Sequence, residues 1–356
     1  MAAEKVLVGM SGGVDSTVAA LLLLKNGCFV TGVTMEVAPE GAPGGGESCY
    51  GPENIVEIKR LAARLGISHS SLDLRAEYAV FVLAYFKSEY AAGRTPNPCV
   101  MCNRQVKFGA LLEKAASSGI NFDKFATGHY ARLERDSSGG LLLKKGRDAR
   151  KDQTYFLWNI PRKRLERVLF PLGGLTKEEV RELAVAAGFE ELARKPESQD
   201  FAPPEALDKL LDCGNGPGDI LDSSGAVCGR HKGIARYTVG QRKGLGIGGL
   251  GEPLFVSAIN PAENTVTVSS KSTLSRKLVR LRAMNWVSTG PASGCLNVRV
   301  KIRRQHEPAA AKFWPEENGG GRVEFEQGQF APTPGQSAVL YDGDVLLGGG
   351  IIESAD

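Results

Sequence analysis

The chain has 356 residues, of which 42% are hydrophobic and 24% charged, and its formal net charge is +4. These proportions exclude a disordered or collagen-like chain, and at about 150 residues per domain the length predicts two or three domains. No apolar run approaches the roughly 18–20 residues of a membrane helix, and a strand pattern begins at Lys5, so we expect a cytoplasmic protein without membrane association or targeting peptide.

The first 200 residues alternate between strand and helix patterns. A short Val-rich apolar run predicts a strand at 5–10, and we expect further strands at 28–35, 67–72 and 124–127. Longer segments with helical spacing predict helices at 15–25, 53–65, 76–92, 104–117 and 176–187, the last with a capping box of Thr176 and Glu179. Strands that alternate with helices of this length predict right-handed βαβ units, and therefore an α/β domain with a Rossmann-like parallel sheet over residues 1–202.

The remainder of the chain has a different pattern. Twelve of the 44 glycines fall between Gly214 and Gly251, and short alternating segments follow at 265–269, 297–302 and 322–325. Residues 339–347 predict a hairpin with an Asp-Gly turn at Asp342 and Gly343. We therefore expect a small β-rich central domain over residues 203–273 and a C-terminal β-barrel over residues 274–356.

Two segments are strongly basic although the net charge is modest. Residues 144–167 hold nine Lys and Arg against three Asp and Glu, and residues 276–312 hold nine against the single Glu307. Each could be a solvated surface, but two such segments beside a nucleotide-binding domain favour a polyanionic partner such as RNA.

A glycine-rich loop directly follows the first strand and precedes the first helix. Its sequence is Gly9-Met10-Ser11-Gly12-Gly13-Val14-Asp15-Ser16. Glycines allow the backbone to approach a phosphate, serines donate hydrogen bonds, and the helix N-terminus attracts an anion. The loop lacks the Lys of the kinase-type phosphate loop and does not fit the dinucleotide pattern.

The sequence SGGVDS in this loop resembles the signature of the ATP pyrophosphatase, or PP-loop, superfamily. Further along the chain, four segments resemble the tRNA-specific 2-thiouridylases, the MnmA family. They are GRTPNPCVMCNR with VKFG (93–109), ATGHYAR (126–132), KDQTYFL (151–157) and YTVGQRKGLG (237–246). Five separated motifs in the family order make the resemblance specific, and it implies a PP-loop domain, a small central domain and a C-terminal β-barrel.

The resemblance implies an ATP-dependent sulfurtransferase that makes 2-thiouridine at the wobble uridine of tRNA. AMP is transferred to the uracil C2 oxygen, pyrophosphate is released, and a sulfur nucleophile then displaces AMP. The ATP contacts implied by the matching positions are Gly9, Met10, Ser11, Gly12, Gly13, Val14, Asp15, Ser16, Met35 and Gly128. Asp15 is also the expected contact for Mg²⁺.

The same resemblance implies Cys102 as the nucleophile and several contacts to tRNA. Asn97, Pro98 and position 99 match the loop that contacts the target base. The other implied tRNA contacts are His129, Lys151, Asp152, Gln153, Arg303, Arg304 and Gln336. A cysteine desulfurase or a sulfur-relay protein is the implied sulfur donor, and we expect a monomer.

Two positions depart from the family pattern. Cys99 stands where the family usually has Asp, so that Cys99 and Cys102 form a CxxC pair. Ala202 stands where the family has the cysteine that carries the persulfide. Because alanine cannot carry sulfur, the route of sulfur to the base is open.

Three hypotheses account for this exchange. Cys99 could substitute as the sulfur carrier or resolving thiol, so that the CxxC pair does both tasks. Cys99 and Cys102 could instead hold an iron–sulfur cluster with a third ligand from Cys49, Cys213 or Cys228. The protein could also be a paralogue that binds ATP and tRNA without thiolation. Cys28 and Cys295 are expected to be buried small hydrophobic residues.

A further alternative is a PP-loop ligase that uses an amine nucleophile. The CxxC pair argues against it, because an amine acceptor needs no such thiols. The odd total of seven cysteines fits reduced thiols better than a disulfide framework.

Overall fold

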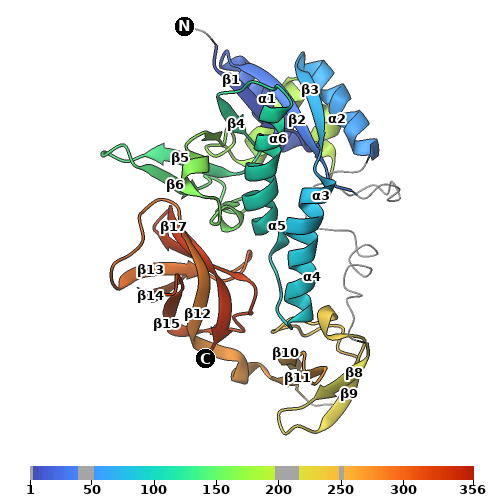
Figure 1. Cartoon of the computed structure of the whole chain (residues 1–356), viewed down its shortest axis with the longest axis vertical. Coiled ribbons are helices and arrows are strands. Elements are labelled where there is room, and N and C mark those ends of the chain that lie inside the picture. Colours follow the sequence, from blue (N-terminus) through green and yellow to red (C-terminus); the bar gives the residue numbers. More distant parts are fainter. Residues whose placement is uncertain (1–2, 39–51, 197–215, 248–251) are drawn as a thin grey trace. The chain divides into compact units, whose positions relative to one another are not determined.

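The computed structural model describes residues 3–38, 52–196, 216–247 and 252–356 (Figure 1). The chain divides into two compact units. The first consists of Met1–Val82, Cys99–Pro203 and Asp344–Leu346, and the second of Leu83–Pro98, Pro204–Gly343 and Leu347–Asp356. No helix in the described ranges is long and apolar enough to cross a lipid bilayer.

The first unit is built on a parallel sheet with the strand order β3-β2-β1-β4-β7. The strands are β1 (Lys5–Gly9), β2 (Phe29–Glu36), β3 (Ser68–Asp73), β4 (Lys124–Ala126) and β7 (Val168–Leu169). Every pairing in this sheet is parallel, which confirms the predicted α/β class. Because the chain runs outward from β1 to β3 and then returns to β4 on the other side of β1, the ligand-binding switch point lies between β1 and β4.

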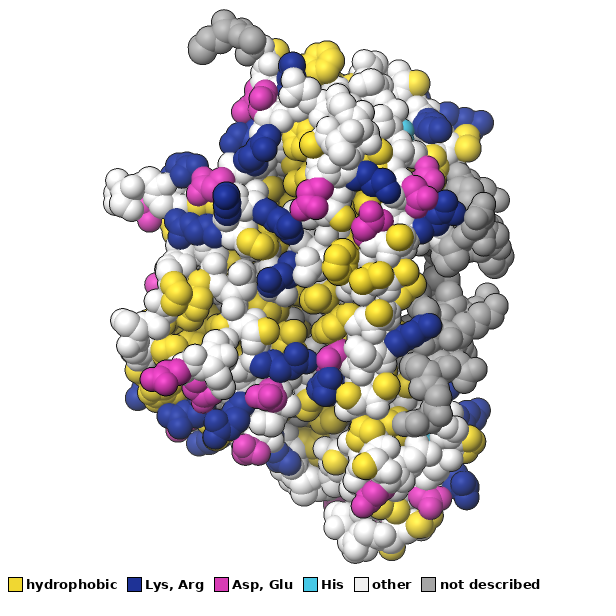
Figure 2. All heavy atoms as spheres, viewed as in Figure 1, with side chains coloured by type: hydrophobic (Ala, Val, Ile, Leu, Met, Phe, Trp, Pro, Cys, Tyr) yellow, Lys and Arg dark blue, Asp and Glu magenta, His cyan; other side chains and the backbone are white. Residues whose placement is uncertain are grey.

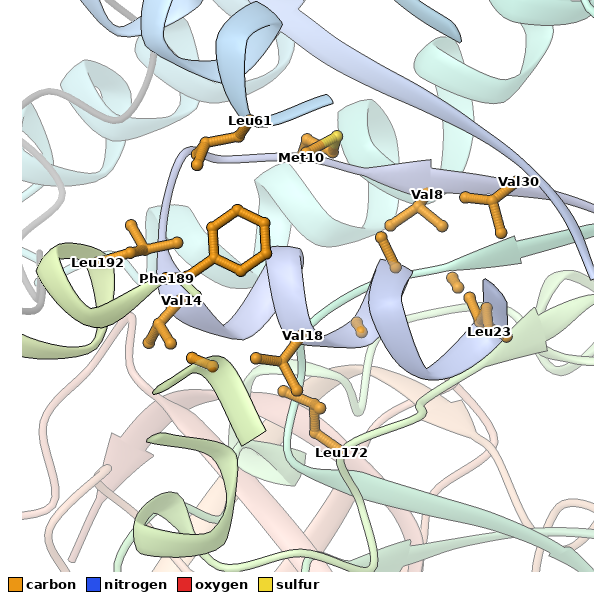
Figure 3. Close-up of a cluster of buried hydrophobic side chains, with 14 of the residues drawn as sticks. Val8, Met10, Val14, Val18, Leu23, Val30, Leu61, Leu172, Phe189 and Leu192 are labelled. Atoms are coloured by element: carbon orange, nitrogen blue, oxygen red, sulfur yellow. The ribbon is translucent and has the colours of Figure 1, made fainter. Parts of the chain in front are cut away.

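Helices packed on this sheet enclose the core of the first unit. They are α1 (Val14–Lys25), α2 (Pro52–Leu65), α8 (Lys177–Ala186) and α9 (Glu190–Arg194). Figure 3 shows Val18 of α1 beside Leu172, and Phe189 between Val14 and Leu61, within one buried cluster. The predicted capping box at α8 is confirmed, because the Glu179 N–H donates to Thr176 Oγ1 at 3.2 Å and the Thr176 N–H donates to Glu179 Oε2 at 2.7 Å.

Two helical segments contain π-helical stretches that the sequence pattern did not predict. The first comprises α3 (Arg75–Tyr78), the π-helix η1 (Ala79–Leu83) and α4 (Ala84–Ala91). The second comprises α5 (Pro98–Met101), the π-helix η2 (Cys102–Ala110) and α6 (Leu111–Ser117). The prediction that this second helix starts at residue 104 was wrong. It starts at Pro98, where proline fits the first helical position because the N–H it lacks would have no partner there.

A hairpin interrupts the alternation of strands and helices. β5 (Ala131–Arg135) and β6 (Leu141–Lys145) pair in antiparallel register around a Ser-Gly-rich turn, and the predicted element order did not include them. The chain then continues through the short helices η3 (Thr154–Phe156) and α7 (Arg162–Leu165).

The second unit contains two β structures (Figure 1, yellow and orange to red). The first is a four-stranded sheet with the order β10-β11-β8-β9. Its elements are β8 (Gly218–Leu221), β9 (Val227–His231), η4 (Ile234–Arg236), β10 (Leu254–Asn260), β11 (Thr265–Ser270) and η5 (Lys271–Leu274). Buried Ile220, Val256 and Val266 form the centre of its small core.

The second β structure is the predicted C-terminal barrel. Its strands are β12 (Ser275–Trp286), β13 (Leu296–Lys301), β14 (Ala309–Pro315), β15 (Gly321–Phe330), β16 (Ser337–Asp342) and β17 (Val345–Ala355). They follow the order β12-β15-β14-β13-β16-β17, and pairing of β12 with β17 closes the barrel. The Asp-Gly turn between β16 and β17 is confirmed, with φ of +54° at Gly343.

Candidate functional site

The loop between β1 and α1 is held in a tight turn. Gly12 has a φ of +77°, and a Cβ at this position would lie 2.5 Å from the Asn54 Oδ1 atom. The Ser11 N–H donates to Ser16 Oγ at 3.2 Å, and Asn54 Nδ2 donates to the Ser11 carbonyl at 3.2 Å. Glycine at position 12 is therefore required both by the backbone conformation and by the neighbouring side chain.

The N-terminus of α1 has the features of an anion site. Gly13 is its N-cap residue and provides no side chain to accept hydrogen bonds from the first-turn N–H groups. The N–H groups of the first helical turn have no hydrogen-bond acceptor within the helix. Together with the helix dipole they favour a phosphate at this position. Met10 and Val14 point into the hydrophobic core (Figure 3), so any contact they make with a phosphate would come from their backbone.

Gly128, after β4, lies directly against this loop. A Cβ on Gly128 would stand 2.8 Å from the Asp15 carbonyl carbon and 2.9 Å from the Ser16 nitrogen. The structure therefore brings Gly128 to the phosphate loop at the switch point. Met35 lies near the end of β2, opposite Leu72 of β3, and its side chain is buried.

We expect Gly128→Ala to weaken ATP binding. The added methyl group must displace backbone atoms of Asp15 and Ser16, and overpacking of this kind costs about 1–3 kcal/mol, which corresponds to roughly a 5- to 150-fold loss of affinity. Isothermal calorimetry with ATP measures this change. Gly174→Ala is the matched control, because no atom lies within 4 Å of a Cβ at that position. Equal ATP affinity in the two variants would contradict the placement of ATP at this loop.

Lys177 is a functional candidate that the sequence did not reveal. Its side chain is 2% exposed, and its Nζ atom donates to Asp15 Oδ1 at 2.7 Å. The Tyr130 hydroxyl donates to the same Oδ1 atom at 2.8 Å. A lysine is buried only when it is paired, so this ion pair fixes the Asp15 carboxylate at the start of α1. The sequence signal was limited to the capping box beside it, because one lysine in a charged helix is unremarkable.

Cys99 and Cys102 lie one helical turn apart, and their thiols differ in environment. Cys99 is exposed, whereas Cys102 is half-buried at the start of η2. Burial raises the pKa of the Cys102 thiol to about 11, the Lys107 charge opposes this rise, and Cys99 adds to it. Tyr78 lies close to both thiols, since they act with burial to raise the pKa of its hydroxyl. The two cysteines therefore form one site with an accessible and a sheltered thiol.

The π-helix explains how Lys107 acts on Cys102. In a π-turn the N–H of residue i+5 bonds to the carbonyl of residue i, and the wider turn brings residues five apart closer to the same face than an α-helix does. Cys102 and Lys107 are five apart within η2. Helical spacing of 3.6 residues would have separated them, which is why the sequence pattern did not connect the two.

Alkylation of Cys102 should increase steeply with pH. Because the thiolate is the reactive form and the pKa of Cys102 is raised to about 11, its alkylation rate should rise about tenfold per pH unit from pH 7 to pH 10. Iodoacetamide labelling followed by peptide mass spectrometry measures this rate, with exposed Cys99 in the same digest confirming that the reagent is active. A rate that levels off below pH 9 would contradict the raised pKa.

Three predicted tRNA contacts of the first unit take part in the fold. His129 hydrogen-bonds with Thr127 Oγ1 at 2.7 Å, and its ring lies 6.0 Å from both the Phe108 and Phe170 rings. Burial and the Lys107 charge lower the pKa of His129 well below its usual value, so the ring is neutral.

Asp152 and Gln153 accept hydrogen bonds from backbone N–H groups of the first unit. Asp152 accepts from the Gly146 N–H and from the Thr154 hydroxyl, and Gln153 Oε1 accepts from the Tyr130 N–H at 2.9 Å. Lys151, the residue before them, is half-buried.

Acidic partners neutralise much of the first basic segment, 144–167. Lys144 pairs with Glu134 at 2.6 Å, and Arg147 and Arg150 pair with Glu179 and Glu178 at 3.0 Å. On the face drawn in Figure 2, Lys and Arg side chains are interspersed with Asp and Glu. Net charge along a segment therefore overstates the positive field that a polyanion would meet.

The remaining predicted contacts belong to the second unit. Asn97 is 7% exposed, and Pro98 is half-buried. Arg303 donates to Thr333 Oγ1 at 2.8 Å and to the carbonyls of Val239 and Ala331, so its guanidinium holds backbone of its own unit. Arg304 is exposed, and Gln336 Nε2 donates to the carbonyls of Thr95 and Pro96.

Of the remaining positions of the cysteine hypotheses, some lie outside the described residues and others are more exposed than predicted. Ala202, Cys49 and Cys213 lie outside the described residues. Within those residues, no group of three His, Cys, Asp or Glu could hold a metal ion together. Cys228 donates to the Ile220 carbonyl at 3.4 Å. The prediction that Cys295 is buried was wrong, because it is exposed just before β13, and Cys28 is half-buried beside the main core.

Comparison with known proteins gives matches along almost the whole chain. Residues 4–202 match the tRNA methyl transferase HUP domain, 207–270 the tRNA methyl transferase PRC-barrel domain, and 276–352 the aminomethyltransferase beta-barrel domain. The chain is 45% identical to the tRNA-specific 2-thiouridylase MnmA of Endomicrobium trichonymphae, over 98% of each chain. It is 43% identical to the proteins of that name from Heliobacterium modesticaldum, over 98% of this chain and 92% of the relative, and Moorella thermoacetica, over 98% and 99%.

Proposed function

Since this chain belongs to the family of tRNA-specific 2-thiouridylases, we propose that it is an ATP-dependent sulfurtransferase that converts the wobble uridine of tRNA to 2-thiouridine. The observation that carries the proposal is 45% identity over 98% of the chain, in a protein that joins a phosphate loop and a CxxC pair. Two of the matching domain families are described as tRNA methyl transferase domains. We favour thiolation over methylation because the relatives that match over the full length are tRNA-specific 2-thiouridylases.

The first step activates the base. The phosphate loop and the N-terminus of α1 would hold the ATP phosphates, with Met35 and Gly128 beside the adenosine. The uracil C2 oxygen attacks the α-phosphorus, the bond to the β-phosphate oxygen breaks, and pyrophosphate leaves. Mg²⁺ would offset the phosphate charge, and Asp15 would hold it through the carboxylate oxygen that does not bond to Lys177.

The second step transfers sulfur through the CxxC pair. We assign the persulfide to Cys99, because its exposed thiol can meet a sulfur donor such as a cysteine desulfurase or relay protein. The terminal sulfur attacks C2 and AMP leaves, which joins the base to Cys99 through a disulfide. The Cys102 thiolate then attacks Cys99 Sγ, and the 2-thiouridine sulfur departs with the electron pair. The resulting Cys99–Cys102 disulfide is reduced by an external dithiol.

An iron–sulfur cluster does not fit the thiols that the described residues bring together. A cluster needs three or four ligands, and Cys99 and Cys102 are two. We therefore derive no step through a cluster. Anaerobic purification followed by iron and sulfide analysis decides between the CxxC dithiol and an iron–sulfur cluster. Stoichiometric iron would favour the cluster.

Among the implied tRNA contacts, exposed Arg304 and half-buried Pro98 are the best placed to meet RNA directly. A neutral His129 would contact tRNA through a hydrogen bond at its Nε2 atom rather than by charge. We further propose domain boundaries at residues 202 and 273, a monomer, and a location in the cytoplasm, where the thiols would stay reduced.

A reconstituted reaction tests the proposed function. The purified protein is incubated with ATP, Mg²⁺, unmodified tRNA, a persulfide source and a dithiol, and the nucleosides and nucleotides are quantified. We expect one AMP and one pyrophosphate for each 2-thiouridine. AMP with an aminated base would indicate the amine ligase instead. Binding of ATP and tRNA without either product would indicate the paralogue that lacks turnover.

A further inference from the structure

We propose that the C-terminal barrel positions the segment 93–98, which leads directly into Cys99, and that Gln336 is the positioning residue that holds it. This inference rests on the proposed function, because it concerns the chain that carries Asn97 and Pro98 into the CxxC pair. Segment 93–98 and the barrel residues that touch it all belong to the second unit. The contacts join the segment to β12, to the turn before β16 and to the central sheet.

A buried ion cluster fixes the start of the segment. The Glu89 side chain, on α4, is 6% exposed, and its carboxylate accepts from Arg94 at 2.6 and 2.8 Å. Arg282 of β12 donates to both oxygens of the same carboxylate at 3.0 and 3.1 Å. Burial raises the pKa of Glu89, but the hydrogen bonds and charges of Arg94 and Arg282 outweigh burial and lower it overall. The carboxylate is therefore ionised, and it ties Arg94 to the barrel wall.

The middle of the segment is held through its backbone. The Thr95 N–H donates to the Pro334 carbonyl at 2.8 Å. Gln336 Nε2 donates to the Thr95 and Pro96 carbonyls, both at 3.1 Å. The primary amide of glutamine has two N–H donors, and each of these carbonyls takes one. The Gln336 backbone is itself fixed, because its N–H donates to the Thr333 carbonyl and its carbonyl accepts from Ile352.

Close packing prevents the segment from moving toward the barrel. Gly335 has a φ of +91°, and a Cβ there would lie 2.7 Å from the Thr95 carbonyl oxygen. On the side of the central sheet, a Cβ on Gly93 would lie 2.9 Å from Pro261, and Thr95 Oγ1 donates to Thr238 Oγ1 at 3.1 Å. Contacts from several directions thus set the position of residues 93–96 before the chain reaches Asn97.

These contacts give Gln336 a role different from a direct tRNA contact. Proline at 96 and 98 has no N–H, so Pro96 can be held by a hydrogen bond only through its carbonyl, and Gln336 holds this carbonyl together with that of Thr95. Removing the amide would release both carbonyls and let the segment shift. Because a displacement of about 1 Å in a reacting group can cost roughly 100-fold in rate, the sulfur-transfer rate should depend strongly on Gln336. The affinity for tRNA should change little, because Asn97 and Pro98 are only two of the proposed tRNA contacts.

Gln336→Met tests the proposal, because methionine keeps the length of the side chain and removes both donors. Gln327→Met, at an exposed position on β15, is the matched control. The experiment measures kcat for 2-thiouridine formation, Kd for tRNA by filter binding, and melting temperature. We expect a loss in kcat of about 10- to 100-fold with Kd within about twofold of the unmodified protein. Gln336→Glu, whose carboxylate cannot donate to the carbonyls, should lose at least as much.

Two results would overturn the proposal. A Kd that rises more than about fivefold, whatever happens to kcat, would make Gln336 a direct tRNA contact. Unchanged kcat and Kd would show that the barrel does not position the segment. If Gln336→Met fails to fold, Gln336→Asn keeps the amide but shortens its reach and is judged by the same criteria.

A readout without turnover separates this inference from the proposed function. The alkylation rate of Cys99 in the free protein should change at least about threefold in Gln336→Met and stay constant in Gln327→Met, because Cys99 follows the segment directly. If the unsubstituted protein makes no 2-thiouridine, the proposed function fails, and the Cys99 rates alone still decide the positioning role.

Discussion

Cys102→Ser is expected to abolish the release of 2-thiouridine, with a loss of about 1,000-fold or more in the single-turnover rate of release. A serine hydroxyl cannot attack the disulfide that joins Cys99 to the base, so the product stays bound to the protein after the first sulfur transfer. Quantifying the 2-thiouridine released in a single turnover, without added dithiol, measures the loss, because an external dithiol would itself cleave this disulfide. Pyrophosphate release should continue for one turnover, because adenylation does not use this thiol.

Cys295→Ser is the control for this prediction, because Cys295 is exposed and lies in the second unit. Its rate should match that of the unsubstituted protein. A Cys102→Ser protein that keeps more than about a tenth of the rate would contradict the role of Cys102 as the thiol that releases the product, since loss of an essential thiol costs far more than tenfold.

Lys177→Met is expected to destabilise the protein by about 3 kcal/mol and to remove measurable ATP binding. Breaking a buried ion pair leaves an uncompensated charge, which costs about 3–5 kcal/mol, and the lower value applies because the Asp15 side chain is 32% exposed. Loss of the lysine also leaves the Asp15 carboxylate as an unopposed negative charge where ATP phosphates would bind. Urea unfolding and calorimetry with ATP measure the two effects.

A double-mutant cycle provides the control. Asp15→Asn in the Lys177→Met protein removes the stranded carboxylate, so the double variant should be more stable than Lys177→Met alone by about 1 kcal/mol or more. If Lys177→Met unfolds at the same urea concentration as the unsubstituted protein and binds ATP equally well, the ion pair has no role in the site.

Much of the fold was predictable because local signals agree with tertiary structure. Strand β1, the glycine loop and α1 follow one another without ambiguity. Gly27 and Gly188 have positive φ shortly after the helices predicted at 15–25 and 176–187. The Asp342-Gly343 hairpin was predictable for the same reason, since few sequences fit such a turn.

The elements that were predicted wrongly or not at all share a different cause. The spacing of apolar residues in the sequence does not report the hydrogen-bond geometry of the backbone. The π-helical stretch at Cys102 shifts the helix phase, so a search for 3.6-residue spacing began the helix at residue 104 rather than at Pro98. The β5–β6 hairpin was missed because each of its strands has only five residues.

The site was predictable in its residue types and less so in their roles. The phosphate loop and the CxxC pair are contiguous in sequence, and the family resemblance supplied the rest. The partners of Gln153, Arg303 and Gln336 are backbone groups far along the chain, and a sequence motif contains no record of them. Lys177 was missed for the same reason, because Asp15 lies 162 positions away.

The most direct test of the account is a single-turnover transfer of labelled sulfur. The protein is loaded with ³⁵S by a cysteine desulfurase, freed of excess sulfide, and mixed with ATP, Mg²⁺ and unmodified tRNA. We expect the label to leave Cys99 and appear in 2-thiouridine, with one AMP per labelled base and a Cys99–Cys102 disulfide in the protein. Equal transfer of label by a protein in which both cysteines are replaced by serine would contradict it.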